Sequence, residues 1–222
     1  MKLIKFIKEQ MVLIADRDPA MRSKWEVFLY PSFRAMLAYK RSHRLYLKGK
    51  YFRARRISQR AARRTGIEIH PGAEIGEGFF VDHGHGVVIG ETTVIGKNVT
   101  LYQGVTLGGT GKEKGKRHPT IGDNVMISAG AKILGSFTIG ENSKIGAGSV
   151  VLKPVPANST VVGVPGHVVK HNNVRIPYED LNQTDLPDPV QNEMDQIRES
   201  LDALQKAEES RKGTGQEIWS EE

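Results

Sequence analysis

Two short segments of the sequence combine histidine with charged residues. Residues 82–86 read Asp-His-Gly-His-Gly, and residues 117–119 read Arg-His-Pro. A neutral imidazole such as that of His83 is the natural base for a hydroxyl proton near neutral pH. The guanidinium of Arg117 can bind a carboxylate through two parallel hydrogen bonds, and the carboxylate of Asp82 can hold an ammonium group. Together these groups describe a site for a free amino acid with a hydroxyl side chain, although either histidine can equally be a turn residue bonded to the backbone.

The part of the chain that carries both segments has a hydrophobic period of six residues. After Val81 the pattern slips by two residues, and after Leu107 it is interrupted. The aliphatic positions are Ile69, Ile75, Val81, Ile89, Ile95, Leu101, Leu107, Ile121, Ile127, Ile133, Ile139, Ile145 and Val151. A period of six is neither that of a helix nor that of a hairpin sheet, and it is typical of a parallel β-helix of hexapeptide repeats. Three hexads complete one coil, so we predict four to five stacked coils of a left-handed parallel β-helix.

The interruption predicts a loop that leaves the β-helix over residues 108–120. This segment has no aliphatic position that could point into the prism. Loops on repeat scaffolds often carry the binding chemistry, and Arg117 and His118 stand at the end of this one.

The predicted fold is mainly β, with helical segments at both ends. Residues 1–66 are expected to form an N-terminal helical region, in which Asp18 and Pro19 look like the start of a helix. Residues 67–170 form the β-helix domain, and residues 171–222 form a linker and a C-terminal amphipathic helix. In this helix, apolar residues alternate by four and three at Val190, Met194, Ile197, Leu201 and Leu204. A short coiled coil and a helix packed on its own subunit both fit that pattern.

Composition narrows the classes of function. The chain of 222 residues has no cysteine, which excludes disulfides, thiolate metal ligands and a cysteine nucleophile and fits a cytoplasmic protein. Its net charge of +7 includes six arginines between residues 53 and 64. These arginines have three possible interpretations: a patch that binds nucleic acid, a helix face exposed to solvent, or a surface that favours an anionic substrate. Because interleaved aromatic residues are lacking, we predict no nucleic-acid partner. We also predict no membrane span.

Several motifs together resemble the serine acetyltransferases. They are Arg-Asp-Pro-Ala at residues 17–20, Asp82-His83, Val-Ile-Gly-Glu-Thr at 88–92, Val-Thr-Leu-Gly-Gly-Thr-Gly at 105–111, Arg-His-Pro at 117–119, Ala-Gly-Ala-Lys-Ile-Leu-Gly at 129–135 and Gly-Val-Pro at 163–165. The resemblance extends over residues 16–169. It implies transfer of the acetyl group of acetyl-CoA to the hydroxyl of L-serine, which gives O-acetyl-L-serine and CoA in the first step of cysteine biosynthesis from serine. Acetyl-CoA is then a co-substrate, and no metal is expected.

The resemblance also implies roles for single residues. His83 would be the general base, and His118 would lie beside the hydroxyl and position it. Asp18 and Asp82 would bind the serine ammonium, Arg117 the carboxylate, and Gly109 and Ala129 would line the acetyl-CoA channel. Glu68 stands where family members can carry an aspartate that orients the base, although glutamate is one methylene longer.

The resemblance further implies an active site between adjacent subunits of a homotrimer. About 65 residues precede the β-helix, whereas longer members have a larger helical domain that pairs two trimers, so a hexamer is not expected. Members that bind O-acetylserine sulfhydrylase end in isoleucine. Here Ile218 is followed by Trp-Ser-Glu-Glu, so we expect a weak complex with that enzyme or none.

Three alternatives remain at this stage. The first is a hexapeptide acyltransferase for a sugar or antibiotic hydroxyl, which would have no use for Arg117 and two aspartates. The second is a β-helix scaffold without activity, which would not need Arg117 and His118 on a loop. The third is a zinc site of the kind found in β-helix carbonic anhydrases, formed by His83, His85 and His118, but the histidine spacing of that family is absent. Feedback inhibition by cysteine is left open.

Overall fold

The computed structural model describes residues 2–111, 114–171, 197–198 and 200–201. Its compact units are Met1–Leu186 and Pro187–Glu222. In the second unit, Ile197, Arg198, Ser200 and Leu201 are helical. The predicted linker and the other residues of the predicted C-terminal helix lie outside the described residues.

Four helical elements precede the β-helix. They are α1 (Lys2–Arg17), the 3₁₀ helix η1 (Lys24–Phe28), α2 (Pro31–Leu47) and α3 (Tyr51–Thr65). In α1 the buried positions Phe6, Gln10 and Ile14 recur every four residues, which places them on one face of the helix. The end of α3 is marked by Gly66, whose φ of 72° gives the left-handed cap that glycine adopts without strain.

The helix start expected at Asp18 is wrong. The amide of Asp18 donates to the carbonyl of Ile14 at 2.8 Å, so α1 ends there instead. Pro19 disfavours a helical conformation for the residue before it, which explains why the same dipeptide can end a helix. The Asp18 carboxylate accepts the amide of Ala20 at 2.8 Å and shapes the turn that follows.

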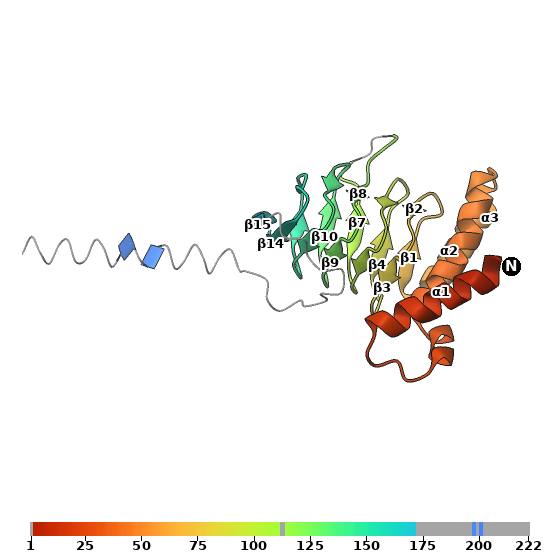
Figure 1. The fold of residues 1–222 in the computed structure, drawn as a ribbon. Coiled ribbons are helices and arrows are strands. Elements are labelled where there is room, and N and C mark those ends of the chain that lie inside the picture. Colours follow the sequence, from red (N-terminus) through yellow and green to blue (C-terminus); the bar gives the residue numbers. More distant parts are fainter. Residues whose placement is uncertain (1, 112–113, 172–196, 199, 202–222) are drawn as a thin grey trace, which may run out of the picture. The chain divides into compact units, whose positions relative to one another are not determined.

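Within residues 67–111 and 114–171, fourteen short strands form the coils of the β-helix, and a fifteenth, β15, pairs with the last of them. They are β1 (Ile67–Ile69), β2 (Glu74–Ile75), β3 (Phe80–Val81), β4 (Val87–Ile89), β5 (Val94–Ile95), β6 (Thr100–Leu101), β7 (Thr106–Gly108), β8 (Thr120–Ile121), β9 (Met126–Ile127), β10 (Lys132–Leu134), β11 (Thr138–Ile139), β12 (Lys144–Ile145), β13 (Val150–Val151), β14 (Ser159–Val162) and β15 (His167–His171). Up to β14 the pairing is parallel and joins each coil to the next, so that β1, β4, β7, β10 and β13 make one five-stranded sheet. A four-stranded and a six-stranded sheet form the other two faces of the prism (Figure 1).

The predicted aliphatic positions fill the prism. All of them are buried except Ile75, which is partly exposed. Since each coil contributes one strand to the five-stranded sheet, the stack has five coils, the upper value predicted. Between the end of β7 at Gly108 and the start of β8 at Thr120, the chain leaves the prism without disturbing the pairing of Ile95 with Ile121.

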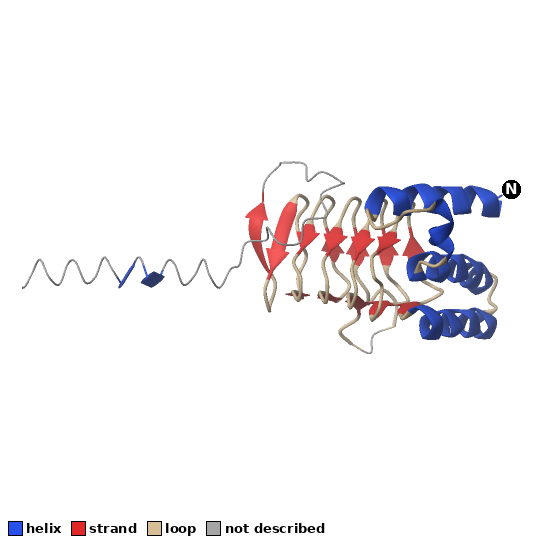
Figure 2. Cartoon of the chain, turned by 90° about the horizontal axis from the view of Figure 1, so that it is seen from below, coloured by secondary structure: helices blue, strands red, loops and turns tan. Residues whose placement is uncertain are grey.

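The helices close the β1 end of the stack (Figure 2). The hydroxyls of Ser58 and Tyr39 donate to the carbonyls of Ile69 at 2.8 Å and Ala73 at 2.7 Å. Nδ1 of His43 lies 2.8 Å from the carbonyl of Pro71. Side chains of α2 and α3 therefore bind carbonyl groups of the first coil. At the other end of the stack, β15 pairs antiparallel with β14.

A ladder of asparagines runs along one corner of the prism. Asn98, Asn124, Asn142 and Asn158 all have φ of 56–57°, in the left-handed region. The side-chain amides of the first three each donate to the side-chain oxygen of the next asparagine, with distances of 3.3, 3.0 and 3.2 Å. Asparagine tolerates this conformation better than other residues with a Cβ, so backbone and side chain both favour it here.

We expect Asn124→Ala to destabilise the protein by about 2–3 kcal/mol, because it loses two ladder bonds and leaves alanine in the left-handed region. Asn124→Gly loses the same bonds without the backbone strain, and should be less destabilised by about 1 kcal/mol. Thermal unfolding of both variants at equal concentration tests this, and equal losses would show that backbone strain contributes nothing.

Candidate active site

One group of predicted site residues lies at the turn from β3 to β4. The amide of His83 donates to Oδ1 of Asp82 at 2.9 Å, and Nε2 of His83 lies 4.0 Å from the same oxygen. His83 has a φ of 55°, a strained conformation that is typical of functional positions. Its side chain is 75% exposed, so the imidazole projects from the prism.

Asp18 and Tyr30 lie beside this turn. The hydroxyl of Tyr30 donates to Oδ2 of Asp18 at 2.5 Å. Burial, this hydrogen bond and the charges of Asp18, Glu26 and Asp82 all raise the pKa of Tyr30, which keeps it a proton donor. Burial also raises the pKa of Asp82, and repulsion from Asp18 adds to the rise while His83 opposes it. Two carboxylates close enough to repel each other are suited to an ammonium group, which would relieve the repulsion.

Arg17 fixes the end of α1 next to Asp18. Its side chain is buried and its guanidinium donates to the hydroxyl of Thr100 on β6. The helical region is thereby attached to the second coil at the point where Asp18 leaves the helix.

A second group lies at the turn from β4 to β5 and at the end of the extruded loop. Nη2 of Arg117 lies 2.5 Å from Oε2 of Glu91, and the hydroxyl of Tyr46 donates to Oε1 of Glu91 at 2.8 Å. The hydrogen bonds from Arg117 and then Tyr46 lower the pKa of Glu91. Glu91 thus links the loop residue Arg117 to helix α2.

His118 is packed against the same turn. It is 9% exposed, and its Nδ1 lies 3.2 Å from the amide of Thr92 and 2.9 Å from the Thr92 hydroxyl. A Cβ on Gly90 would lie 1.9 Å from Cδ2 of His118, so the ring fits only because residue 90 is glycine. Burial, Arg117 and Lys116 lower the pKa of His118, although Glu91 opposes them.

The other predicted residues are spread over neighbouring coils. Glu68 lies on β1, where its Oε1 accepts Nε2 of Gln59 at 3.1 Å and lies 3.9 Å from Nη2 of Arg55. Within the described part of the chain, no hydrogen bond or ion pair joins Glu68 to His83. Gly109 lies against Arg117, because its Cβ would be 2.9 Å from the Arg117 carbonyl oxygen. The carbonyl of Ala129 accepts the amide of Gly148 at 2.8 Å.

The two groups lie at different corners of the prism. The turn at residues 82–86 leads from the six-stranded sheet to the five-stranded sheet, whereas the turn at residues 90–93 leads from the five-stranded to the four-stranded sheet. A single chain therefore does not bring His83 and His118 together. Among the residues that the structure describes, no three histidine, aspartate or glutamate side chains gather as a metal site would require.

Tyr30, Tyr46, Glu91 and Thr92 belong to these groups but were given no role from the sequence. Glu91 and Thr92 lie within the Val-Ile-Gly-Glu-Thr motif. The motif therefore pointed to these two residues but gave no information on what they contact. The two tyrosines come from the helical region, where sequence spacing gives no sign of what a side chain contacts.

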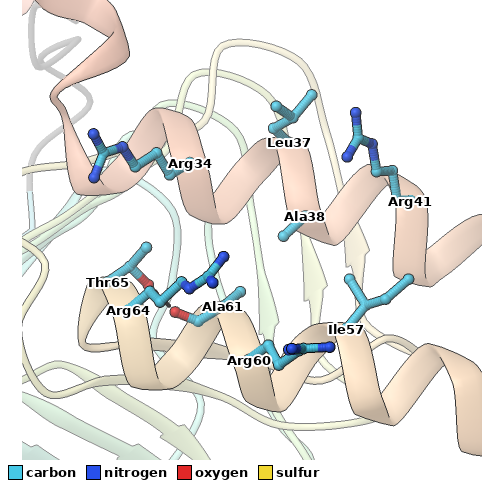
Figure 3. Close-up of a pocket in the computed structure, with 9 residues that line it drawn as sticks. All are labelled: Arg34, Leu37, Ala38, Arg41, Ile57, Arg60, Ala61, Arg64 and Thr65. Carbon is cyan, nitrogen blue, oxygen red and sulfur yellow. Dashed lines mark hydrogen bonds between the residues drawn. The ribbon is translucent and has the colours of Figure 1, made fainter.

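Two arginines of the basic cluster on α3, Arg60 and Arg64, line a separate groove. This groove of about 650 Å³ lies between α2 and α3 and has Leu37, Ala38, Ile57 and Ala61 among its lining residues. Arg34 and Arg41 from α2 and Arg60 and Arg64 from α3 line it as well (Figure 3). None of the predicted site residues lines this groove. Across the described residues, no helix is both long and apolar enough to cross a membrane.

Comparison with known proteins agrees with the repeat pattern. Residues 118–153 match the family model described as bacterial transferase hexapeptide (six repeats). A serine acetyltransferase of Bacillus licheniformis is 56% identical over 213 residues, which are 92% of this chain and 98% of the relative.

Two solved structures extend the comparison. A Neisseria gonorrhoeae serine acetyltransferase in complex with serine has 45% identity and a TM-score of 0.72, covering 76% of this chain and 69% of that one. A Brucella abortus serine acetyltransferase in complex with coenzyme A has 43% identity and a TM-score of 0.72, covering 76% and 68%.

Fold and repeats together define a transferase of the hexapeptide-repeat class, and the predicted mainly β fold with N-terminal helices is confirmed. Identity over nearly the whole of a curated relative decides the family within that class. The chain belongs to the serine acetyltransferase family.

Proposed function

We propose that the protein transfers the acetyl group of acetyl-CoA to the hydroxyl of L-serine and releases O-acetyl-L-serine and CoA. The observation that carries this assignment is the arrangement of Asp18 and Asp82 beside the exposed His83. It offers one amino acid both an ammonium site and a base for its hydroxyl. The complexes of relatives with serine and with coenzyme A support the same two substrates.

In the proposed mechanism His83 takes the hydroxyl proton while the serine oxygen attacks the thioester carbonyl carbon. The tetrahedral intermediate then collapses, the carbon–sulfur bond breaks, and the CoA thiolate recovers the proton from His83. No protein nucleophile is needed, so a chain without cysteine can catalyse the reaction. Arg117 binds the serine carboxylate and must exchange part of its contact with Glu91 to do so.

Glu68 is assigned to orient His83, and Gly109 and Ala129 are assigned to the acetyl-CoA channel. Both assignments come from the family resemblance. Gly109, at the start of the extruded loop, lies against the backbone of Arg117 at its end, and so close to a residue proposed to bind serine.

A homotrimer is part of the proposal. His83 and His118 lie at different corners of one prism, and a threefold arrangement of parallel prisms can set one corner of each subunit against the other corner of its neighbour. Each active site would then take its base from one subunit and Arg117 and His118 from the next. We do not expect the trimers to pair into a hexamer.

For Arg117→Ala, we expect the KM for serine to rise about 10- to 100-fold, because a charge-assisted contact to the carboxylate is lost. The kcat and the KM for acetyl-CoA should change much less. Arg60→Ala, which removes an exposed arginine of the α2–α3 groove, is the matched control and should leave all three constants unchanged. A fall in kcat with an unaltered serine KM would contradict the carboxylate assignment.

We also propose that binding to O-acetylserine sulfhydrylase is weak or absent, because Ile218 is joined to Trp219 and so has no free carboxylate of its own. A pull-down at micromolar concentration measures this. Stoichiometric capture of the sulfhydrylase would contradict the prediction.

The reaction itself is tested by thiol release from acetyl-CoA with and without L-serine. Release that depends on serine and is absent with sugars is the expected result. Release with a sugar alone would favour another hydroxyl acceptor, and no release with any acceptor would favour a scaffold.

A further inference from the structure

The contacts of Thr92 determine which nitrogen of His118 carries the proton. The backbone amide of Thr92 points at Nδ1 of His118 at 3.2 Å. A backbone N–H can only donate, so Nδ1 has to be the acceptor. The neutral ring must then carry its proton on Nε2.

The hydroxyl of Thr92 leads to the same conclusion. Its oxygen accepts the amides of Arg117 at 3.0 Å and His118 at 3.1 Å. With both lone pairs occupied, the hydroxyl proton is left for Nδ1 of His118, 2.9 Å away. The carbonyl of Thr92 accepts Nζ of Lys116 at 2.7 Å. Thr92 therefore holds three successive residues at the end of the extruded loop.

The surroundings of the ring favour its neutral form. Burial lowers the pKa of His118, and the cations Arg117 and Lys116 add to this against the opposing Glu91. Within residues 2–111 and 114–171, no hydrogen-bond partner reaches Nε2 of His118. The Nε2–H group thus remains available to a ligand.

We propose that Thr92 is a positioning residue that fixes His118 as a hydrogen-bond donor through Nε2–H, so that the two histidines of the site act in opposite senses on the serine hydroxyl. This inference rests on the proposed function. The hydroxyl proton then points to His83, one lone pair accepts from His118, and the second lone pair is free to attack the thioester carbon. If Nε2 of His118 were unprotonated, it would accept a hydrogen bond from the serine hydroxyl. It would then compete with His83 for the hydroxyl proton.

The tautomer can be measured without any substrate. In protein labelled with ¹⁵N-histidine, long-range ¹H–¹⁵N correlation spectra distinguish a protonated ring nitrogen from a bare one, and His118→Gln assigns the signals. We expect Nδ1 of His118 to be bare and Nε2 to be protonated at neutral pH. A protonated Nδ1 would overturn the proposal.

Substitution of Thr92 tests the link to catalysis. Thr92→Val removes the hydroxyl but keeps the shape and the backbone amide that faces Nδ1 of His118. We therefore expect Nε2 to stay protonated, the ring signals of His118 to shift because one of the two donors to Nδ1 is lost, and kcat to fall about tenfold, while Thr92→Ser restores both the signals and kcat. Thr93→Val is the matched control, since the Thr93 hydroxyl is buried and has no hydrogen-bond partner among the described residues.

If Thr92→Val keeps the wild-type ring signals and kcat, Thr92 has no positioning role. Failure of the proposed function would look different. The wild-type protein would then show the expected ring signals but no acetyl transfer to serine.

Discussion

His83→Ala should lower kcat with serine by roughly 10²–10⁴-fold, the usual contribution of a general base. The side chain is 75% exposed in the single chain, so its removal leaves no cavity and should not change thermal stability. Steady-state kinetics at saturating acetyl-CoA, together with a melting curve, measure both quantities.

The matched control for this variant is His85→Ala, two residues further along the same turn. His85 is also exposed, and it has no role in the proposed mechanism. We expect its kcat to stay within a factor of two or three of the wild-type value, because exposed positions away from the chemistry tolerate truncation. Near-normal turnover by His83→Ala would show that His83 is not the base.

Gly90→Ala should lower kcat by about 10²-fold or more, because it moves His118 and not because it removes a catalytic group. The new methyl carbon would lie 1.9 Å from Cδ2 and 2.1 Å from Nε2 of His118, so the ring has to leave its place. Displacement of a positioning group by about 1 Å is sufficient for a loss of this size.

Gly49→Ala provides the control for a glycine substitution in general. Gly49 has a φ of 69° and open space around it, so alanine there costs about 1 kcal/mol of backbone strain without any clash. We expect a lower melting temperature with unchanged kcat. If Gly90→Ala behaved in the same way, the position of His118 would not matter for the reaction.

The six-residue period was sufficient to predict the β-helix because it is a local property of the sequence. Each hexad places its own aliphatic residue in the core, so Ile121 to Val151 could be assigned before any contact was known. The contacts of the site are different. Tyr46 and Glu91 are 45 residues apart, and no spacing rule connects them.

The error at Asp18 has a related cause. Asp-Pro occurs both at helix starts and after helix ends, and only the packing of α1 decides between them. The division into three regions, the site roles, the trimer and the cytoplasmic location stay predictions.

Stacked coils have an inherent tendency to grow, because the last strand of any stack offers unpaired backbone groups to the next copy. At the first coil, Ser58 and Tyr39 occupy carbonyls that such a copy would use. At the last coil, β15 runs antiparallel and does not continue the parallel coil pattern. These contacts occupy part of each end of the stack. They disfavour fibre growth along the prism axis and favour association between copies through the sides of the prism, where His83 and His118 lie.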